Sequence, residues 1–77
     1  MNKKEAVAVA LNLYPNWVAQ DKDGEWWAFM NEPRLGSFAK WAPGRNDNTE
    51  DFWQLSKSDG KKHPNWEQSL TEVKRND

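Results

Sequence analysis

The sequence predicts a single α+β domain over residues 1–77, with an N-terminal helix, a three- to four-stranded antiparallel meander and a C-terminal helix packed on the sheet. Residues 17–41 hold four of the six tryptophans, and Gly- and Pro-marked turns divide this stretch. The segments on either side carry apolar residues at helical spacing. The chain has no Cys, so disulfides cannot stabilise its small core. Aromatic side chains, which each bury roughly 150–250 Å², are expected to fill it instead.

The first helix is expected over residues 3–13. Asn2 and Glu5 have the spacing of a capping box, in which each side chain bonds to the other's backbone N–H. Pro15 forces the residue before it out of the helical conformation and ends the helix. The expected apolar stripe, at positions i, i+3, i+4 and i+7, is Val7, Ala10, Leu11 and Tyr14.

Four strands are expected, over residues 16–20, 25–30, 37–41 and 52–55. Asp23-Gly24 supplies the positive-φ pair of a tight hairpin turn between the first two. Pro33 and Gly36 interrupt the chain before the third strand, and Pro43 and Gly44 end it. The lysine pairs 3–4 and 61–62 are interpreted as solvated charges at chain ends and loops.

The C-terminal helix is expected over residues 66–75. Asn65 and Gln68 repeat the capping-box spacing, and Trp66, Leu70 and Val73 form an apolar stripe. The predicted core combines one side chain or more from each region of the chain: Trp17, Trp27, Phe29, Trp41, Leu70 and Leu11.

The second strand predicts a binding surface because it carries aromatic residues on both faces. Trp27 and Phe29 point one way, while Trp26 and Met30 point the other. A sheet with one wet face should alternate apolar and polar residues instead. Two interpretations remain open: the tryptophans lie flat and cover the sheet, or one face is an exposed aromatic patch. The patch hypothesis names Trp26, Met30 and Trp53, with Arg34 and Lys40 at the rim.

Composition argues against an enzyme and against a metal or cofactor site. There is no Cys nucleophile, the single His63 lies in a Lys-rich loop, and the glycines are isolated at turns. Asp21, Asp23 and Glu25 imitate the start of a calcium loop. Trp26 occupies the position where that loop needs Gly, so no calcium site is expected.

The net charge of −1 lacks the basic excess that is typical of nucleic-acid binders. A protein partner is therefore expected. The alternatives are a single-stranded nucleic-acid binder that stacks bases on exposed rings beside Lys or Arg, and a homodimer that uses the exposed tryptophans as its interface.

A cytoplasmic protein is expected, because no apolar run approaches the ~18 residues of a membrane span. The apolar run at residues 6–11 is shorter than the roughly 7–15 residues of a secretory signal.

Residues from Trp17 onward resemble a group of small phage and prophage proteins. The landmarks are Trp17-x-Ala19-x-Asp21-x-Asp23-Gly24-x-Trp26-Trp27-x-Phe29, Pro33, Trp41, and a closing Trp66-x-x-Ser69-Leu70. The proline that often follows the closing motif is absent. The resemblance implies a phage-encoded protein in the host cytoplasm. It leads us to expect a non-catalytic accessory protein that binds a host or phage protein.

The hairpin region also resembles the WW domain in its order of landmarks: Trp17, Gly24, Trp26-Trp27, Asn31, Trp41 and Pro43. The spacings differ from those of that family, so the likeness concerns architecture. Binding of proline-rich peptides is what this resemblance implies.

Overall fold

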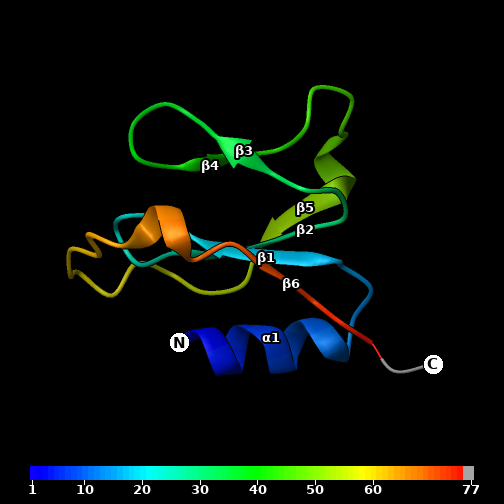
Figure 1. The fold of residues 1–77 in the computed structure, drawn as a ribbon, viewed down its shortest axis with the longest axis horizontal. Coiled ribbons are helices and arrows are strands. Elements are labelled where there is room, and N and C mark those ends of the chain that lie inside the picture. The colour runs from blue at the N-terminus through cyan, green and yellow to red at the C-terminus, as the bar shows by residue number, and fades with distance from the viewer. Residues whose placement is uncertain (76–77) are drawn as a thin grey trace.

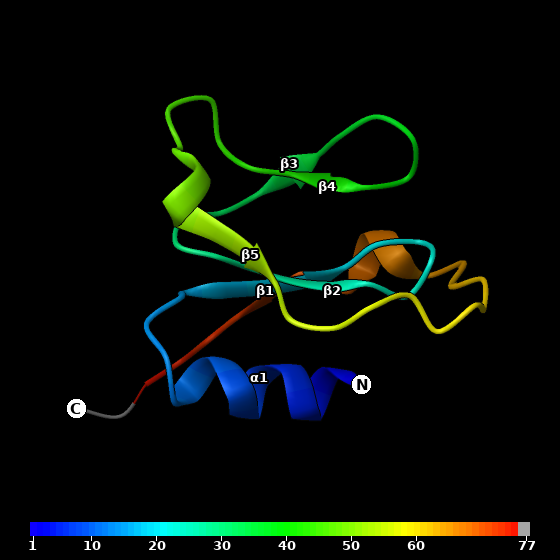
Figure 2. The same cartoon turned by 180° about the vertical axis from the view of Figure 1, so that it is seen from behind.

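The computed structural model describes residues 1–75 as three stacked layers (Figures 1 and 2). The middle layer is a four-stranded antiparallel sheet in the order β5-β2-β1-β6. Helix α1 lies against one face of this sheet, and the two-stranded hairpin β3–β4 lies over the other. The α+β class and the N-terminal helix are confirmed.

Helix α1 spans Lys3–Leu11, two residues shorter than expected, and Asn12 caps its C-terminal end. The predicted capping box is confirmed: Glu5 N donates to Asn2 Oδ1 over 2.8 Å, and Asn2 N donates to Glu5 Oε1 over 3.0 Å. The buried positions of the helix are Ala6 and Ala10, one turn apart. Their small side chains let the helix approach the sheet closely.

The expected stripe of α1 is therefore wrong in part. Ala10 is buried and Val7 packs against the core, whereas Leu11 is 46% exposed and Tyr14 is 66% exposed. The helix faces the sheet with Ala6 and Ala10, and in this orientation Leu11 points to solvent. Leu11 was expected in the core, and this expectation is wrong.

Strands β1 (Trp17–Gln20) and β2 (Trp26–Phe29) form the expected central hairpin, with Val18 opposite Ala28 and Ala19 opposite Trp27. Gly24 in the connecting turn has φ +96°, a conformation that glycine adopts at little cost. Strand β5 (Phe52–Gln54) pairs with the other edge of β2. These three strands lie close to their expected positions.

The third expected strand, over residues 37–41, is wrong. Two short strands, β3 (Arg34–Leu35) and β4 (Trp41–Ala42), form a separate hairpin, and residues 36–40 are its loop. Pro33 has no N–H for a sheet ladder. The chain leaves the sheet there and β5 takes the vacant edge of β2, so the sheet is not a continuous meander.

The C-terminal helix expected over residues 66–75 is also wrong. A single 3-10 turn, η2 (Trp66–Gln68), is followed by strand β6 (Thr71–Glu72), which pairs with β1. The Ser69 hydroxyl donates to Trp66 O over 2.6 Å and accepts from Gln20 N over 2.8 Å, which stops the turn at the sheet. The free edge of β1 then supplies the hydrogen bonds that a helix would have made internally, including Val73 N to Asn16 O over 2.8 Å.

Cross-strand partners share a face of the sheet, so the register assigns each aromatic residue to a layer. The α1 side carries the cluster Ala6, Ala10, Val18, Trp26, Ala28 and Val73, with Val7, Trp53 and Leu55 packed against it. The hairpin side carries Phe29, which is 1% exposed, and the ring of Phe52 stacks on it with centroids 6.3 Å apart. Of the predicted core, Phe29 is confirmed as fully buried, while Trp17, Trp27, Trp41 and Leu70 are half-buried.

The alanine contact of α1 predicts sensitivity to side-chain size. Ala6→Leu should lower the free energy of unfolding by about 1–3 kcal/mol, because added methylenes at a fully buried position force the helix off the sheet. Urea denaturation followed by tryptophan fluorescence measures this. Ala8→Leu, at an exposed position of the same helix, should change it by less than about 0.5 kcal/mol. Equal effects of the two variants would contradict the packing described.

Candidate functional site

Trp26 is not part of an open surface, so the expected exposure of this residue is wrong. Its side chain is 2% exposed, and its Nε1 donates to Met1 O over 2.9 Å. Trp53 is half-buried against the same cluster, with its ring centroid 5.5 Å from that of Tyr14. Helix α1 covers this face of the sheet. The sequence alone did not show which element, if any, would cover it.

The other three residues of the expected site are more exposed than Trp26. Met30 is half-buried and directly follows β2. Arg34, in β3, is exposed, and the Lys40 side chain just before β4 is 49% exposed. Arg34 and Lys40 thus belong to the two sides of one hairpin, and Lys40 reaches the start of the aromatic strand through its ion pair with Glu25, the residue before β2.

The exposed aromatic residue of this hairpin is Phe38. It is 93% exposed at the tip of the loop, which we call the Phe38 tip (residues 36–40). Phe38 and Ala39 have φ values of 61° and 57°. The left-handed region costs an L-residue roughly 1–2 kcal/mol, and for a bulky residue it is an outlier that tends to occur at functional sites. The chain therefore holds a large apolar ring in solvent on a strained backbone.

Three loops meet at the end of the molecule where the Phe38 tip lies, as both views show (Figures 1 and 2). They are the β1–β2 turn, the Phe38 tip and the loop after β5, and we call this region the three-loop end. Lys22 in the turn links the other two through its backbone. Its N–H donates to Ala39 O over 3.2 Å, and its carbonyl accepts from His63 N over 2.9 Å. Ser58 Oγ adds a hydrogen bond to Asp23 O over 2.6 Å.

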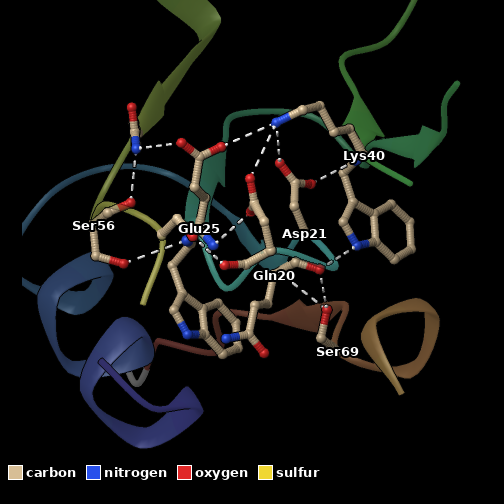
Figure 3. A network of polar contacts seen from close by, with 11 residues as sticks. Gln20, Asp21, Glu25, Lys40, Ser56 and Ser69 are labelled. Atoms are coloured by element: carbon tan, nitrogen blue, oxygen red, sulfur yellow. Dashed lines mark hydrogen bonds and ion pairs between the residues drawn. The ribbon is translucent and has the colours of Figure 1, made fainter. Parts of the chain in front are cut away.

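A cluster of charges fastens the Phe38 tip to the sheet (Figure 3). The Lys40 ammonium lies 3.1 Å from Glu25 Oε1, 3.5 Å from Asp23 Oδ2 and 3.8 Å from Asp21 Oδ2. Asp21 is 2% exposed, and its Oδ1 accepts from Trp41 N over 2.8 Å. One buried carboxylate thus contacts two consecutive residues, Lys40 and Trp41, where the loop that carries Phe38 enters β4.

Burial raises the pKa of the Asp21 carboxyl above its ordinary value of 3.8, since desolvation disfavours the charged form. The hydrogen bond from Trp41 N and the charge of Lys40 oppose this rise, while Asp23 and Glu25 add to it. The pKa of Lys40 is raised, mainly by its hydrogen bond to Glu25.

The acidic triad Asp21, Asp23 and Glu25 has the arrangement of a possible cation site. One ligand atom from each lies within 4.8 Å of the others. The calcium-loop spacing does not predict this convergence, which arises from the β1–β2 turn. The Lys40 ammonium occupies the position where a cation would neutralise the three carboxylates.

A groove of about 410 Å³ opens between the three loops. Phe38 and Ala39 form its apolar side. Four lysines line the rest, together with Asp23, Ser58 and Gly60: Lys22, Lys40, Lys61 and Lys62. Four ammonium groups and one exposed aromatic ring thus line the same groove.

His63 and Asp59 form a pair at the base of the loop after β5. His63 Nε2 lies 2.8 Å from Asp59 Oδ2, and the backbone N–H of Lys61 and this histidine lower the pKa of the Asp59 carboxyl. The pair packs on Gly24, where a Cβ atom would come within 2.4 Å of Asp59 Oδ1. His63, which the sequence places in a Lys-rich loop, is half-buried and packs against the β1–β2 turn.

Of the residues that line the groove, Lys40 was among the predicted site residues, whereas Phe38, Lys22, Lys61 and Lys62 were not. Phe38 fell within an expected strand, and its loop lacks the Asn-Gly or Asp-Gly signal of a positive-φ turn. Lys61 and Lys62 were interpreted as solvated charges. Gly36-Ser37 just before Phe38 was the available signal of a loop.

Comparison with protein-family models, with curated proteins and with solved structures finds no match to this chain. Among the described residues, no helix has the length and apolar character needed to cross a membrane.

The raised pKa of Asp21 predicts a pH dependence of stability. Between 3.8 and the raised value the folded state binds more protons than the unfolded state, so the contribution of Asp21 to the free energy of unfolding falls as pH rises through this window. Asp21→Asn keeps an oxygen for Trp41 N and removes the titration. The stability of the native chain relative to Asp21→Asn should therefore decline with rising pH in urea denaturations. Parallel profiles would contradict the assigned shift.

The strained tip predicts a stabilising substitution. Ala39→Gly should raise the free energy of unfolding by about 0.5–1 kcal/mol, because relief of the left-handed conformation exceeds the entropy cost of glycine. Ala8→Gly, in helix α1, should lower it by about 1 kcal/mol. Thermal and urea unfolding measure both, and a destabilised Ala39→Gly would show that the tip is unstrained.

Proposed function

We propose that this chain is a non-catalytic accessory protein that binds a protein partner through the Phe38 tip. The observation that carries the proposal is a phenylalanine that is 93% exposed on a left-handed backbone. The free protein bears both the strain and the exposed apolar area, and no contact within residues 1–75 offsets the exposure. Aromatic side chains of this kind are the anchors that contribute most to protein interfaces.

The surroundings of Phe38 suit an interface. Leu35, in the adjoining strand β3, is 50% exposed and adds apolar surface to the same hairpin. Arg34 and Lys40 lie on the same hairpin and supply a polar rim. The proposed site thus includes Arg34 and Lys40 from the five residues expected at the binding site. Its anchor is Phe38 instead of Trp26.

The tip is also held in place before any partner binds. Gly36 N donates to Lys40 O over 2.8 Å, Lys22 N donates to Ala39 O, and Lys40 is tied to three carboxylates. A loop that is already ordered loses less conformational entropy when it binds. This rigidity supports recognition by shape at Phe38.

The non-catalytic role rests on the arrangement of the reactive groups. Among residues 1–75, His63 pairs with Asp59, and the nearby Ser58 hydroxyl donates to a backbone carbonyl rather than to His63. A nucleophile held by a base is therefore missing from this end of the described chain. The phage-like landmarks support an origin in a phage or prophage and action in the cytoplasm of the bacterial host.

Photo-crosslinking tests the proposal directly. A benzophenone amino acid in place of Phe38 should capture a protein from a bacterial host lysate, whereas the same group in place of Lys4, on the outer layer α1, should not. Unlabelled native chain should compete for capture. Phe38→Asn, which tolerates the left-handed backbone, should compete at least about tenfold less well.

Three outcomes would contradict the proposal. Equal competition by Phe38→Asn would remove Phe38 as the anchor. Crosslinks from position 4 alone would place the interface on α1. Crosslinks only to a second copy of this chain, with a dimer in light scattering, would favour the homodimer.

A further inference from the structure

We propose that the groove at the three-loop end binds an acidic peptide segment of the partner, with Phe38 packing against an apolar residue of that segment. This inference rests on the proposed function and specifies the chemistry of its partner. It starts from the four lysines that line the groove.

The lysines of the groove divide into two roles. Lys40 already forms ion pairs within the chain, because its ammonium lies between Asp21, Asp23 and Glu25. Lys22, Lys61 and Lys62 are exposed and form no ion pair with any residue of 1–75. Three positive charges therefore line the groove without an ion pair among residues 1–75, although the whole chain has a net charge of −1. Charge complementarity selects an anionic occupant.

The loop that carries Lys61 and Lys62 is ordered by its own side chains. Gly60 N donates to Ser58 Oγ over 3.2 Å, and Lys61 N donates to Asp59 Oδ1 over 2.9 Å. Asp59 is in turn held by His63, whose backbone N–H bonds to Lys22 O. The three lysines thus project from a connected frame.

An acidic peptide fits this groove better than a single strand of nucleic acid. Strand binders line a continuous basic channel with several rings that stack successive bases, whereas this groove offers one ring and about 410 Å³. Asp23 lies within the groove and Asp59 beside it, so a phosphate backbone would meet repulsion as it left the lysines. A peptide with a few carboxylates needs only the local charge, and its N–H groups can donate to Asp23.

Fluorescence anisotropy with a fluorescein-labelled peptide of alternating Glu and Leu residues tests the inference. The comparison probes are the same peptide with Gln in place of Glu, and a labelled oligothymidylate of equal length. The groove variant removes the three unpaired charges by the combined substitutions Lys22→Gln, Lys61→Gln and Lys62→Gln. The control variant makes the same change of charge outside the groove by the combined substitutions Lys3→Gln, Lys4→Gln and Lys74→Gln. Circular dichroism checks that each variant folds.

The native chain should bind the acidic peptide at least about tenfold more tightly than the Gln peptide. Each neutralised groove lysine should weaken binding about two- to fivefold, as exposed ion pairs do, so the groove variant should lose roughly tenfold or more. The control variant should stay within about twofold of the native chain. Phe38→Asn should also weaken binding, and added salt should reduce it.

Several results would overturn the inference. These are a groove variant within about twofold of the native chain, no preference for the acidic peptide, or oligothymidylate binding as tight as that of the peptide. The last result would identify a single-strand nucleic-acid binder instead. If the peptide fails while position 38 still crosslinks a protein, the acidic segment is wrong and binding through Phe38 stands. If both fail, the proposed function falls as well.

Discussion

The aromatic residues on both faces of β2 impose the constraint that shapes the rest of the molecule. Trp26 and Ala28 face one way, and Trp27 and Phe29 face the other, so neither face can be left to water. A chain this short has to supply two covers. Helix α1 closes the first face through two alanines, and the β3–β4 hairpin closes the second (Figure 1). The three-layer arrangement follows from this requirement.

The second cover needs a fastening, because a hairpin of two-residue strands is marginal on its own. The buried Asp21 carboxylate provides it, with one oxygen on the backbone of β4 and the other facing Lys40 (Figure 3). Desolvation of this carboxylate costs stability. The desolvated carboxylate lies where the hairpin meets the sheet. Its interactions with Trp41 N and Lys40 also hold the loop that presents Phe38.

Features that lower stability therefore gather at the three-loop end, which carries the proposed site. It holds a desolvated carboxylate, two consecutive left-handed residues and a ring in solvent. Nothing comparable occurs at α1, whose cap and packing follow ordinary preferences. Stability and recognition thus make opposite demands on Phe38. Folding alone would favour Gly or Asn there, whereas an interface requires a large apolar side chain.

The sequence by itself determined the elements whose signals are local: the capping box at Asn2, the Asp23-Gly24 turn and the aromatic central hairpin. It could not show which element covers which face of the sheet. The local sequence around Trp26 is compatible both with burial under a helix and with exposure to solvent. Tertiary structure alone decided that residues 71–72 pair with β1 rather than continue a helix, since that choice depends on a free strand edge. It also decided the site. The lysines of three separate loops converge on Phe38 only once Asp21 and Lys22 have joined those loops.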